Sequence, residues 1–141
     1  AALPHLSLSS HLFASLAPYR AMLMEEAAAH GWPLVRPTWL HYPDDNATLD
    51  LDAQFMEGAD LLVAPVLQPK QVNVTVYVPA DTWLHPFTNM TLRSTGQNVT
   101  LPAPIGEPAV LVRLDATGSP PPQLEPFLTA VRASLNHAVL H

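Results

Sequence analysis

The sequence predicts an α/β unit followed by an all-β segment and a C-terminal helix, because its hydrophobic pattern changes twice. Apolar residues recur at spacings of three and four in residues 7–30, as in an amphipathic helix. Residues 34–40 are apolar on both faces, as in a buried strand of a parallel sheet. From residue 61 to about residue 114 the period becomes two, which is typical of half-buried antiparallel strands.

The first predicted helix runs from Ser7 to His30. Gly31 can end it in a left-handed turn, because glycine has no Cβ to oppose that conformation. Pro18 lies inside the pattern and is expected to kink the helix or split it in two, since proline donates no backbone hydrogen bond. The apolar stripe of this helix comprises Leu12, Phe13, Leu16, Leu23 and Ala27.

The strand predicted over residues 34–40 contains Pro37, which indicates a bulge or distorted pairing. Turn-forming residues 42–46 follow it. Leu51 to Glu57 can form a short helix that Gly58 stops.

Four strand-like segments predict a small antiparallel sandwich, and they span residues 61–66, 72–78, 98–101 and 109–113, with clear alternation in 72–78 and 98–101. Residues 118–122 read as a linker too proline-rich to be helical. Beyond it, Phe127, Leu128, Val131 and Leu135 trace one face of an amphipathic tail helix.

Composition excludes several classes of partner and site. The 141 residues carry a formal net charge of −6, which disfavours binding to nucleic acid or to anionic membranes. No apolar run approaches the roughly 20 residues of a membrane-spanning helix, and residues 1–5 do not resemble a signal peptide. There is no cysteine, and the histidines are not spaced as metal ligands. We expect no cofactor and no metal.

Four of the five asparagines lie in N-x-[ST] triplets, the acceptor sequence for N-glycans. They are Asn46, Asn73, Asn89 and Asn98. Threonine is also common in strands, so part of this pattern has a structural alternative. We expect N-glycosylation and a location in the secretory pathway, meaning outside the cell, at its surface, or in a lysosome or vacuole. In the strands at 72–78 and 98–101 the asparagines share the polar face with threonines, so they should point to solvent.

Three stretches together resemble glycoside hydrolase family 31. Residues 16–37 are similar to the family pattern L-x-P-Y, E-A and G-x-P-x-x-R-P, which also accounts for Pro18 and Pro37. Residues 52–66 are similar to D-x-Q-F-x-x-G-x-x-L-L-V-A-P-V, and residues 76–83 to V-Y-L-P-x-G-x-W, with Asp81 in place of the usual glycine. Residues 83–85 and 103–110 further resemble the sulfoquinovosidase branch, with α-glucosidase and α-xylosidase as alternatives.

The resemblance implies three domains or parts. Residues 1–60 would be the C-terminal end of a (β/α)8 catalytic barrel, incomplete in this chain. Residues 61–116 would be the proximal C-terminal β-sandwich, and residues 117–141 a proline linker and tail helix. The partners it implies are the remainder of the barrel, in the same longer chain or a partner chain, and an α-linked carbohydrate substrate.

The resemblance also implies a retaining α-glycosidase, which needs two carboxyl groups as nucleophile and acid/base. The family motifs that hold them do not occur in this sequence, so we expect no catalytic residue here and no activity of the chain alone. Loops after the barrel strands form the catalytic face of such a barrel. Trp39, His41, Tyr42 and Asp44 are therefore candidates for the substrate rim, with packing under the loop as the alternative.

Two further expectations concern a buried arginine and an alternative function. Arg36 should form a structural ion pair with a carboxylate that this chain need not contain. The alternative to an enzyme is a non-catalytic, family-derived glycoprotein module with an adhesive or assembly role, which four closely placed N-x-[ST] triplets would suit.

Overall fold

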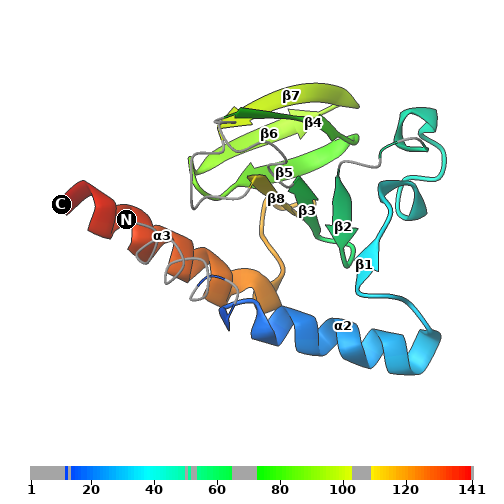
Figure 1. Cartoon of the computed structure of the whole chain (residues 1–141), viewed down its shortest axis with the longest axis horizontal. Helices are drawn as coiled ribbons and strands as arrows, with labels where there is room; N and C mark the ends of the chain where they lie inside the picture. The colour runs from blue at the N-terminus through cyan, green and yellow to red at the C-terminus, as the bar shows by residue number, and fades with distance from the viewer. Residues whose placement is uncertain are drawn as a thin grey trace.

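Two layers of β-structure and one layer of helices form the molecule (Figure 1). The computed structural model describes residues 12, 14–49, 51, 54–64, 73–102 and 109–140, with side chains described up to residue 134. The helices are α2 (Ala17–His30) and α3 (Glu125–Leu140), with short 3₁₀ helices η1 (Thr38–Leu40), η2 (Asn46–Thr48) and η3 (Pro122–Leu124). The strands are β1 (Val35–Arg36), β2 (Phe55–Glu57), β3 (Leu61–Ala64), β4 (Asn73–Val78), β5 (Asp81–His85), β6 (Met90–Ser94), β7 (Gln97–Pro102) and β8 (Ala109–Arg113).

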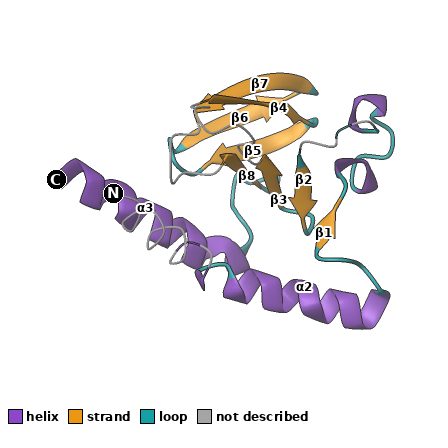
Figure 2. Ribbon diagram, viewed as in Figure 1, coloured by secondary structure: helices purple, strands orange, loops and turns teal. Residues whose placement is uncertain are grey.

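The central layer is a six-stranded sheet in the order β1-β2-β3-β8-β5-β6, with every neighbouring pair antiparallel. Strands β4 and β7 form a separate two-stranded antiparallel sheet. Because successive side chains of a strand point to opposite faces, Leu61 and Leu62 enter different cores. Figure 2 shows α2 and α3 on one side of the six-stranded sheet and the β4–β7 pair on the other.

The helix-side core joins α2, η3 and α3 to the six-stranded sheet. Leu16, Leu23 and Val112 are among its buried members, together with Phe127 and Val131 of the tail helix. Pro18 stands in the first turn of α2, where its missing amide hydrogen costs no hydrogen bond.

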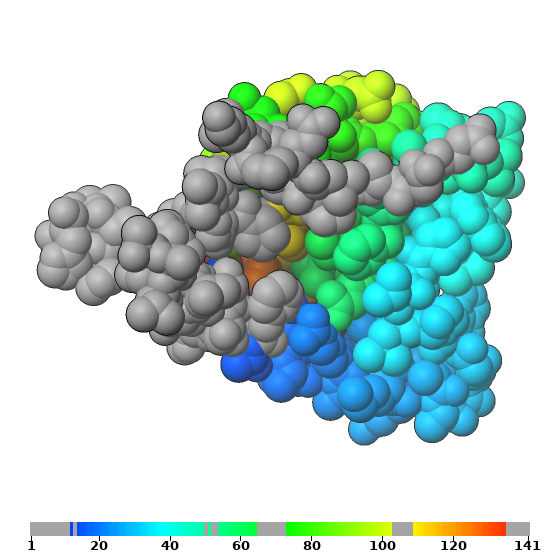
Figure 3. Space-filling view, viewed as in Figure 1, coloured from blue at the N-terminus to red at the C-terminus, as the bar shows by residue number. Residues whose placement is uncertain are grey.

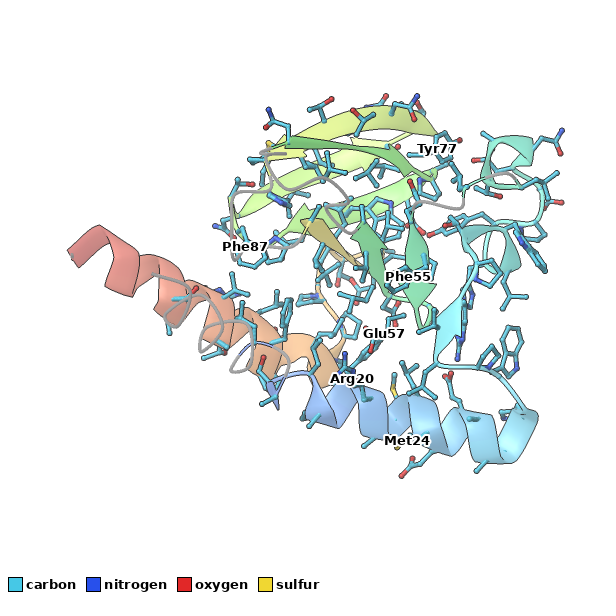
Figure 4. All side chains as sticks on the ribbon, in the orientation of Figure 1. Arg20, Met24, Phe55, Glu57, Tyr77 and Phe87 are labelled. Atoms are coloured by element: carbon cyan, nitrogen blue, oxygen red, sulfur yellow. The ribbon has the colours of Figure 1, made fainter. Side chains whose placement is uncertain are left out.

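One tyrosine ties α2 to the β2–β3 turn. Tyr19 is fully buried, donates its hydroxyl to the Glu57 carbonyl (2.7 Å) and accepts the Asp60 amide (3.1 Å). Arg20 Nε lies 2.6 Å from Glu57 Oε1, and Figure 4 shows these two side chains directed toward each other.

The second core lies between the two sheets. Met56, Leu62 and Leu111 from the six-stranded sheet meet Val76 and Leu101 from β4 and β7 in one buried cluster. The predicted small antiparallel sandwich is therefore confirmed.

A buried amide also links the two sheets. Gln54 donates to the Tyr77 carbonyl (2.8 Å) and accepts the Tyr77 amide (2.9 Å), so its side chain pairs with β4 as a strand would.

The strand predicted over residues 34–40 is wrong in length and in pairing. Only Val35 and Arg36 form a strand, and β1 pairs antiparallel to β2 at the edge of the sheet. Residues 38–40 turn into η1 instead. Pro37 explains why the strand ends at Arg36, because proline has no amide hydrogen to donate to the β2 ladder. It precedes the first residue of η1.

Two other predictions need correction. The helix expected over Leu51–Glu57 is not formed, because Phe55–Glu57 pairs with β3 as a hairpin that turns at Gly58. The β5–β6 hairpin was not predicted, since its strands have a mixed polar and apolar pattern.

Other elements agree with the sequence. The strand β8 has the predicted bounds, Gly31 caps α2 with φ 74°, and α3 buries Phe127, Leu128 and Val131. Residue 12 is helical and a turn at residues 15–16 precedes α2, so the helix is split near Pro18 as expected. Within the predicted linker, residues 118–121 are non-helical but Pro122 begins η3. Residues 7–11, 13, 52–53, 65–66 and 72 of the predicted elements, and the side chain of Leu135, lie outside what the structure describes.

The predicted boundary near residue 60 crosses a continuous sheet. Strands β1 and β2 precede it, yet they extend the same sheet as β3 and β8. The division into barrel end, sandwich and tail stays a prediction. In the part of the chain that the structure describes, no helix is long and apolar enough to cross a bilayer.

Candidate functional site: the loop after strand β1

Arg36 is the organising side chain at the end of β1. It is only 2% exposed, and its Nη2 lies 2.8 Å from Glu26 Oε2 of α2. Its Nε donates to the Pro33 carbonyl (2.6 Å), and its guanidinium carbon lies 5.2 Å from the Trp32 ring centroid. The expected structural ion pair is thus present, and its partner, Glu26, belongs to this chain.

His41 is held against the same group. Its Nε2 lies 3.1 Å from Arg36 Nη1, and its ring stacks on Trp32 with centroids 5.9 Å apart and planes 16° from parallel. Burial, followed by the charge of Arg36, lowers the pKa of His41 below its usual value. The neutral ring therefore accepts the Arg36 hydrogen bond through Nε2.

Tyr42 turns the other way, toward the sandwich. Its ring packs against the inter-sheet core and lies 6.3 Å from the Trp83 ring centroid. Its hydroxyl donates to Asp81 Oδ2 at 3.3 Å, and burial beside that carboxylate raises its pKa.

The loop is fastened at its far end by Asp45. Its carboxylate accepts the Ala47 amide (3.1 Å) and the Tyr77 hydroxyl (2.5 Å). That hydrogen bond raises the pKa of Tyr77 to about 12. Residues 42–48 are therefore pinned to β4.

The four rim candidates do not converge on one point. His41 belongs with Trp32 and Arg36, Tyr42 belongs with Asp81 and Trp83, and Trp39 and Asp44 are exposed. Sequence reasoning missed Trp32, Glu26 and Asp81 as their neighbours. The G-W-P triplet before the strand was the available signal for Trp32; no spacing rule pointed to Asp81, 39 residues beyond Tyr42.

Large exposed apolar side chains gather in the same part of the chain. Five of the six that the described residues present fall between residues 24 and 49, in α2, the α2–β1 connection, β1 and the segment after β1. They are Met24 (60% exposed), Trp32 (39%), Val35 (59%), Trp39 (41%) and Leu49 (56%). This segment, blue to cyan in Figure 3, forms one side of the molecule.

The acceptor asparagines of the four N-x-[ST] triplets are all exposed, at Asn46, Asn73, Asn89 and Asn98. Asn89 adopts a left-handed φ of 55° in the turn between β5 and β6, a conformation that asparagine tolerates better than most residues. Among the described residues no group of histidines and carboxylates is arranged to hold a metal ion.

His85 is a second histidine with a burial-dependent charge. It is fully buried, its Nδ1 lies 2.6 Å from Thr88 Oγ1, and among the described residues its Nε2 has no hydrogen-bond partner. Burial lowers its pKa below 6.5. The folded state therefore favours neutral His85, and the stability this gives is present above pH 6.5 and is lost as the pH falls below it.

We predict that the thermal unfolding midpoint falls as the pH is lowered from about 7 to about 5, a window in which most carboxylates stay ionised. Each unit by which the folded pKa lies below the unfolded value is worth about 1.4 kcal/mol. The His85→Phe variant, measured by circular dichroism melting, should show a shallower pH dependence. An unchanged slope in His85→Phe would assign the effect to other groups.

The chain matches one family model over residues 31–116, described as the glycosyl hydrolase family 31 C-terminal domain. It is 39% identical over 112 residues to a sulfoquinovosidase of Escherichia coli (strain K12), covering 79% of this chain and 16% of that protein. It is 40% identical over 129 residues to a probable alpha-glucosidase of Oryza sativa subsp. japonica, covering 89% and 14%. A lysosomal alpha-glucosidase of Bos taurus is 33% identical over 141 residues, covering 89% and 15%.

Solved structures give the same picture. A family 31 sulfoquinovosidase from E. rectale superposes with a TM-score of 0.76 at 28% identity, covering 87% of this chain and 17% of that one. A family 31 alpha-xylosidase from a soil metagenome superposes with a TM-score of 0.71 at 30% identity, covering 88% and 16%. The chain thus spans about one sixth of the length of the relatives it matches.

Proposed function

Because this chain belongs to glycosyl hydrolase family 31, where it matches the C-terminal domain, we propose that it serves as the structural C-terminal part of a retaining α-glycosidase. Such an enzyme hydrolyses O-glycosidic bonds with two carboxyl groups about 5–5.5 Å apart. In this proposal both carboxyl groups lie in the remainder of the catalytic barrel.

The carboxylates of this chain support a structural role. Glu26, Glu57 and Asp60 each lie within 2.8 Å of an arginine nitrogen, from Arg36, Arg20 and Arg113 respectively. Each of these ion pairs joins two segments of the fold, so the carboxylates are engaged in structural contacts. The family motifs that hold the nucleophile and the acid/base do not occur in the sequence.

The observation that most supports a missing neighbour is that β1 is an edge strand among the residues that the structure describes. Gly58 donates its amide to the Leu34 carbonyl (2.9 Å), and hydrogen-bonded and non-bonded pairs alternate along an antiparallel ladder. Leu34–Gly58 is thus a hydrogen-bonded pair, Val35–Glu57 is a non-hydrogen-bonded pair, and Arg36–Met56 is again hydrogen-bonded. The Val35 amide and carbonyl therefore point away from β2. We propose that a preceding barrel strand pairs with this edge, and that residues 1–60 complete the barrel.

Exposed apolar side chains beside that edge fit the same neighbour. Val35, Trp39 and Met24 leave about half of their surface in water, which is unfavourable unless another element covers it. The remainder of the barrel is the partner we propose for them.

The rim residues follow from this placement. Loops after the barrel strands surround the substrate in barrels of this kind. Since Trp39, His41, Tyr42 and Asp44 come after β1, we propose them for the substrate rim. Trp39 is the best suited of the four to contact a sugar, because Tyr42 already packs inside the sandwich.

We propose an α-linked glycoside as the substrate class, since the relatives include sulfoquinovosidases and alpha-glucosidases, and solved alpha-xylosidases superpose as well. A sulfoquinovoside is one of three candidates. We also propose a secreted or lysosomal glycoprotein, supported by four exposed N-x-[ST] asparagines and by the lysosomal relative.

A second candidate function is a non-catalytic glycoprotein module of the same family, with an adhesive or assembly role. The four exposed acceptor asparagines favour it as much as they favour a secreted enzyme. It differs from the first candidate in requiring no intact catalytic carboxylates upstream.

Hydrolysis of a 4-nitrophenyl α-glycoside distinguishes the enzyme proposal from the non-catalytic module. We predict no release of nitrophenol by the 141-residue chain, and release by the longer protein that carries it together with the barrel. Cleavage by the chain alone would contradict the proposal. An inactive longer protein whose family carboxylates are replaced would favour the non-catalytic module.

A further inference from the structure

The four N-x-[ST] triplets are alike in the exposure of their asparagines but differ in the burial and hydrogen bonding of their threonines. All four asparagines are exposed. A transferase that reads the threonine hydroxyl must contact both side chains and the backbone between them. The state of that hydroxyl and backbone therefore decides whether a triplet is usable in the folded domain.

Two triplets lie in the β4–β7 ladder. Asn73–Thr75 pairs with Thr100–Pro102, and Asn98 pairs with Tyr77, so both triplets are fixed along their length. Residues paired across the ladder share a face, which places Asn73 and Asn98 together on the outer face.

The two threonine hydroxyls of these triplets are bonded to each other. Thr75 Oγ1 lies 3.1 Å from Thr100 Oγ1. The strands cannot lift away singly, because Val76 and Leu101 are each 1% exposed in the inter-sheet core.

The third triplet is blocked by burial. Thr48 is 1% exposed, and its hydroxyl lies 2.7 Å from the Asp45 carbonyl and 3.2 Å from the Tyr42 carbonyl. Asn46 begins η2, whose first turn is capped by the Asp45 carboxylate. The asparagine is exposed while its partner hydroxyl is inside the loop.

The fourth triplet is open. Asn89 lies outside the ladder in the exposed β5–β6 turn, whereas Met90 and Thr91 pair with β5 on one side only, because β6 is the last strand of the sheet. Within the described part of the chain, no hydrogen bond occupies the Thr91 hydroxyl. Hairpin turns are also where a backbone opens at least cost.

We propose that Asn46, Asn73 and Asn98 receive N-glycans only before the domain folds, whereas Asn89 also accepts one in the folded state. The donor class is a polyprenyl-pyrophosphate-linked oligosaccharide. The asparagine amide nitrogen bonds to the anomeric carbon of the sugar, the carbon–oxygen bond to pyrophosphate breaks, the lipid pyrophosphate leaves, and the amide releases one proton. This inference rests on the proposed secretory route.

The proposed glycans also restrict which face of the domain can contact the barrel. Glycans on Asn73 and Asn98 make the outer face of β4–β7 a solvent face, because a bulky hydrated glycan opposes protein packing. That face lies on the side of the six-stranded sheet away from α2 (Figure 1), so the barrel partner is left to the β1 side.

The test uses unglycosylated chain made in a bacterial cytoplasm, folded as judged by near-ultraviolet circular dichroism, with microsomal transferase and its lipid-linked donor. Occupancy is measured by mass spectrometry after peptide N-glycosidase treatment in ¹⁸O water. We expect occupancy at Asn89 in the folded chain, and at least about tenfold lower occupancy at the other three than in matched synthetic peptides. The Trp83→Ala chain, in which the domain should open far more often, is the control and should raise modification at Asn46, Asn73 and Asn98.

Two results would overturn the inference. Equal modification of Asn73 and Asn98 in the folded chain and in peptides would show that folding does not prevent their modification. In protein secreted from eukaryotic cells, occupancy of Asn89 but not of Asn46, Asn73 and Asn98 would contradict modification before folding. No occupancy at any of the four would contradict the secretory route itself, and would leave the proposed hydrolysis to its own assay.

Discussion

The Trp83→Ala variant should lose about 3–5 kcal/mol of folding free energy, the range found when buried tryptophans are truncated. Trp83 is fully buried between the two sheets, and its indole Nε1 donates to the Pro79 carbonyl at 3.1 Å. Removing the ring leaves a cavity beside Tyr42 and orphans that carbonyl. Since small domains are stable by only about 5–15 kcal/mol, this loss removes a large share of the free energy of unfolding and should lower the urea midpoint markedly.

Urea denaturation followed by circular dichroism measures this loss. Trp32→Ala is the matched control, because Trp32 is 39% exposed and its truncation should cost about 1 kcal/mol or less in the isolated chain. Equal losses at the two positions would mean that the inter-sheet core is not formed around Trp83.

The Gly58→Ala variant should be destabilised by about 3 kcal/mol or more, from two separate causes. Gly58 has φ 67°, a left-handed conformation that costs a residue with a Cβ about 1–2 kcal/mol. The added methyl would also lie 2.5 Å from Leu23 Cδ2 and in overlap with the Tyr19 hydroxyl. Tyr19 cannot move freely, because its hydroxyl is bonded on both sides to the β2–β3 turn.

Gly31→Ala separates the two causes. Gly31 has a similar φ of 74°, but an added Cβ meets nothing within 4 Å. It should cost only the backbone share, about 1–2 kcal/mol. If thermal or urea unfolding gives equal losses for Gly31→Ala and Gly58→Ala, the close approach of α2 to the β2–β3 turn is contradicted.

The elements that the sequence predicted correctly are those whose hydrophobic pattern matches the faces that they bury in the fold. Strand β8 is apolar throughout and is buried by both cores, so its bounds were predicted correctly. The tail helix and the β4 and β7 strands have one apolar face each, which periodicity detects. Residues 55–57 were misassigned because their helical pattern is short, and pairing with β3 outweighs a weak local preference.

The candidate site shows the same limit. Chain order placed Trp39, His41, Tyr42 and Asp44 in one loop, but long-range contacts divide them. Arg36 and Trp32 hold His41, while Asp81 and Trp83 hold Tyr42 from another strand. Spacing along the sequence carries no information on such partners. The structural ion pair of Arg36 was expected from burial alone, and its partner Glu26 became visible only when α2 was placed beside β1.

Amide hydrogen exchange at Val35 tests most directly whether this chain completes a barrel. In the isolated chain the Val35 amide faces outward from the edge strand and should exchange rapidly. In the longer protein, pairing with a neighbouring barrel strand should slow its exchange by at least about tenfold, since opening a paired strand costs at least about 1.4 kcal/mol. Equally rapid exchange of Val35 in both proteins would show that no strand covers β1, and would contradict the account.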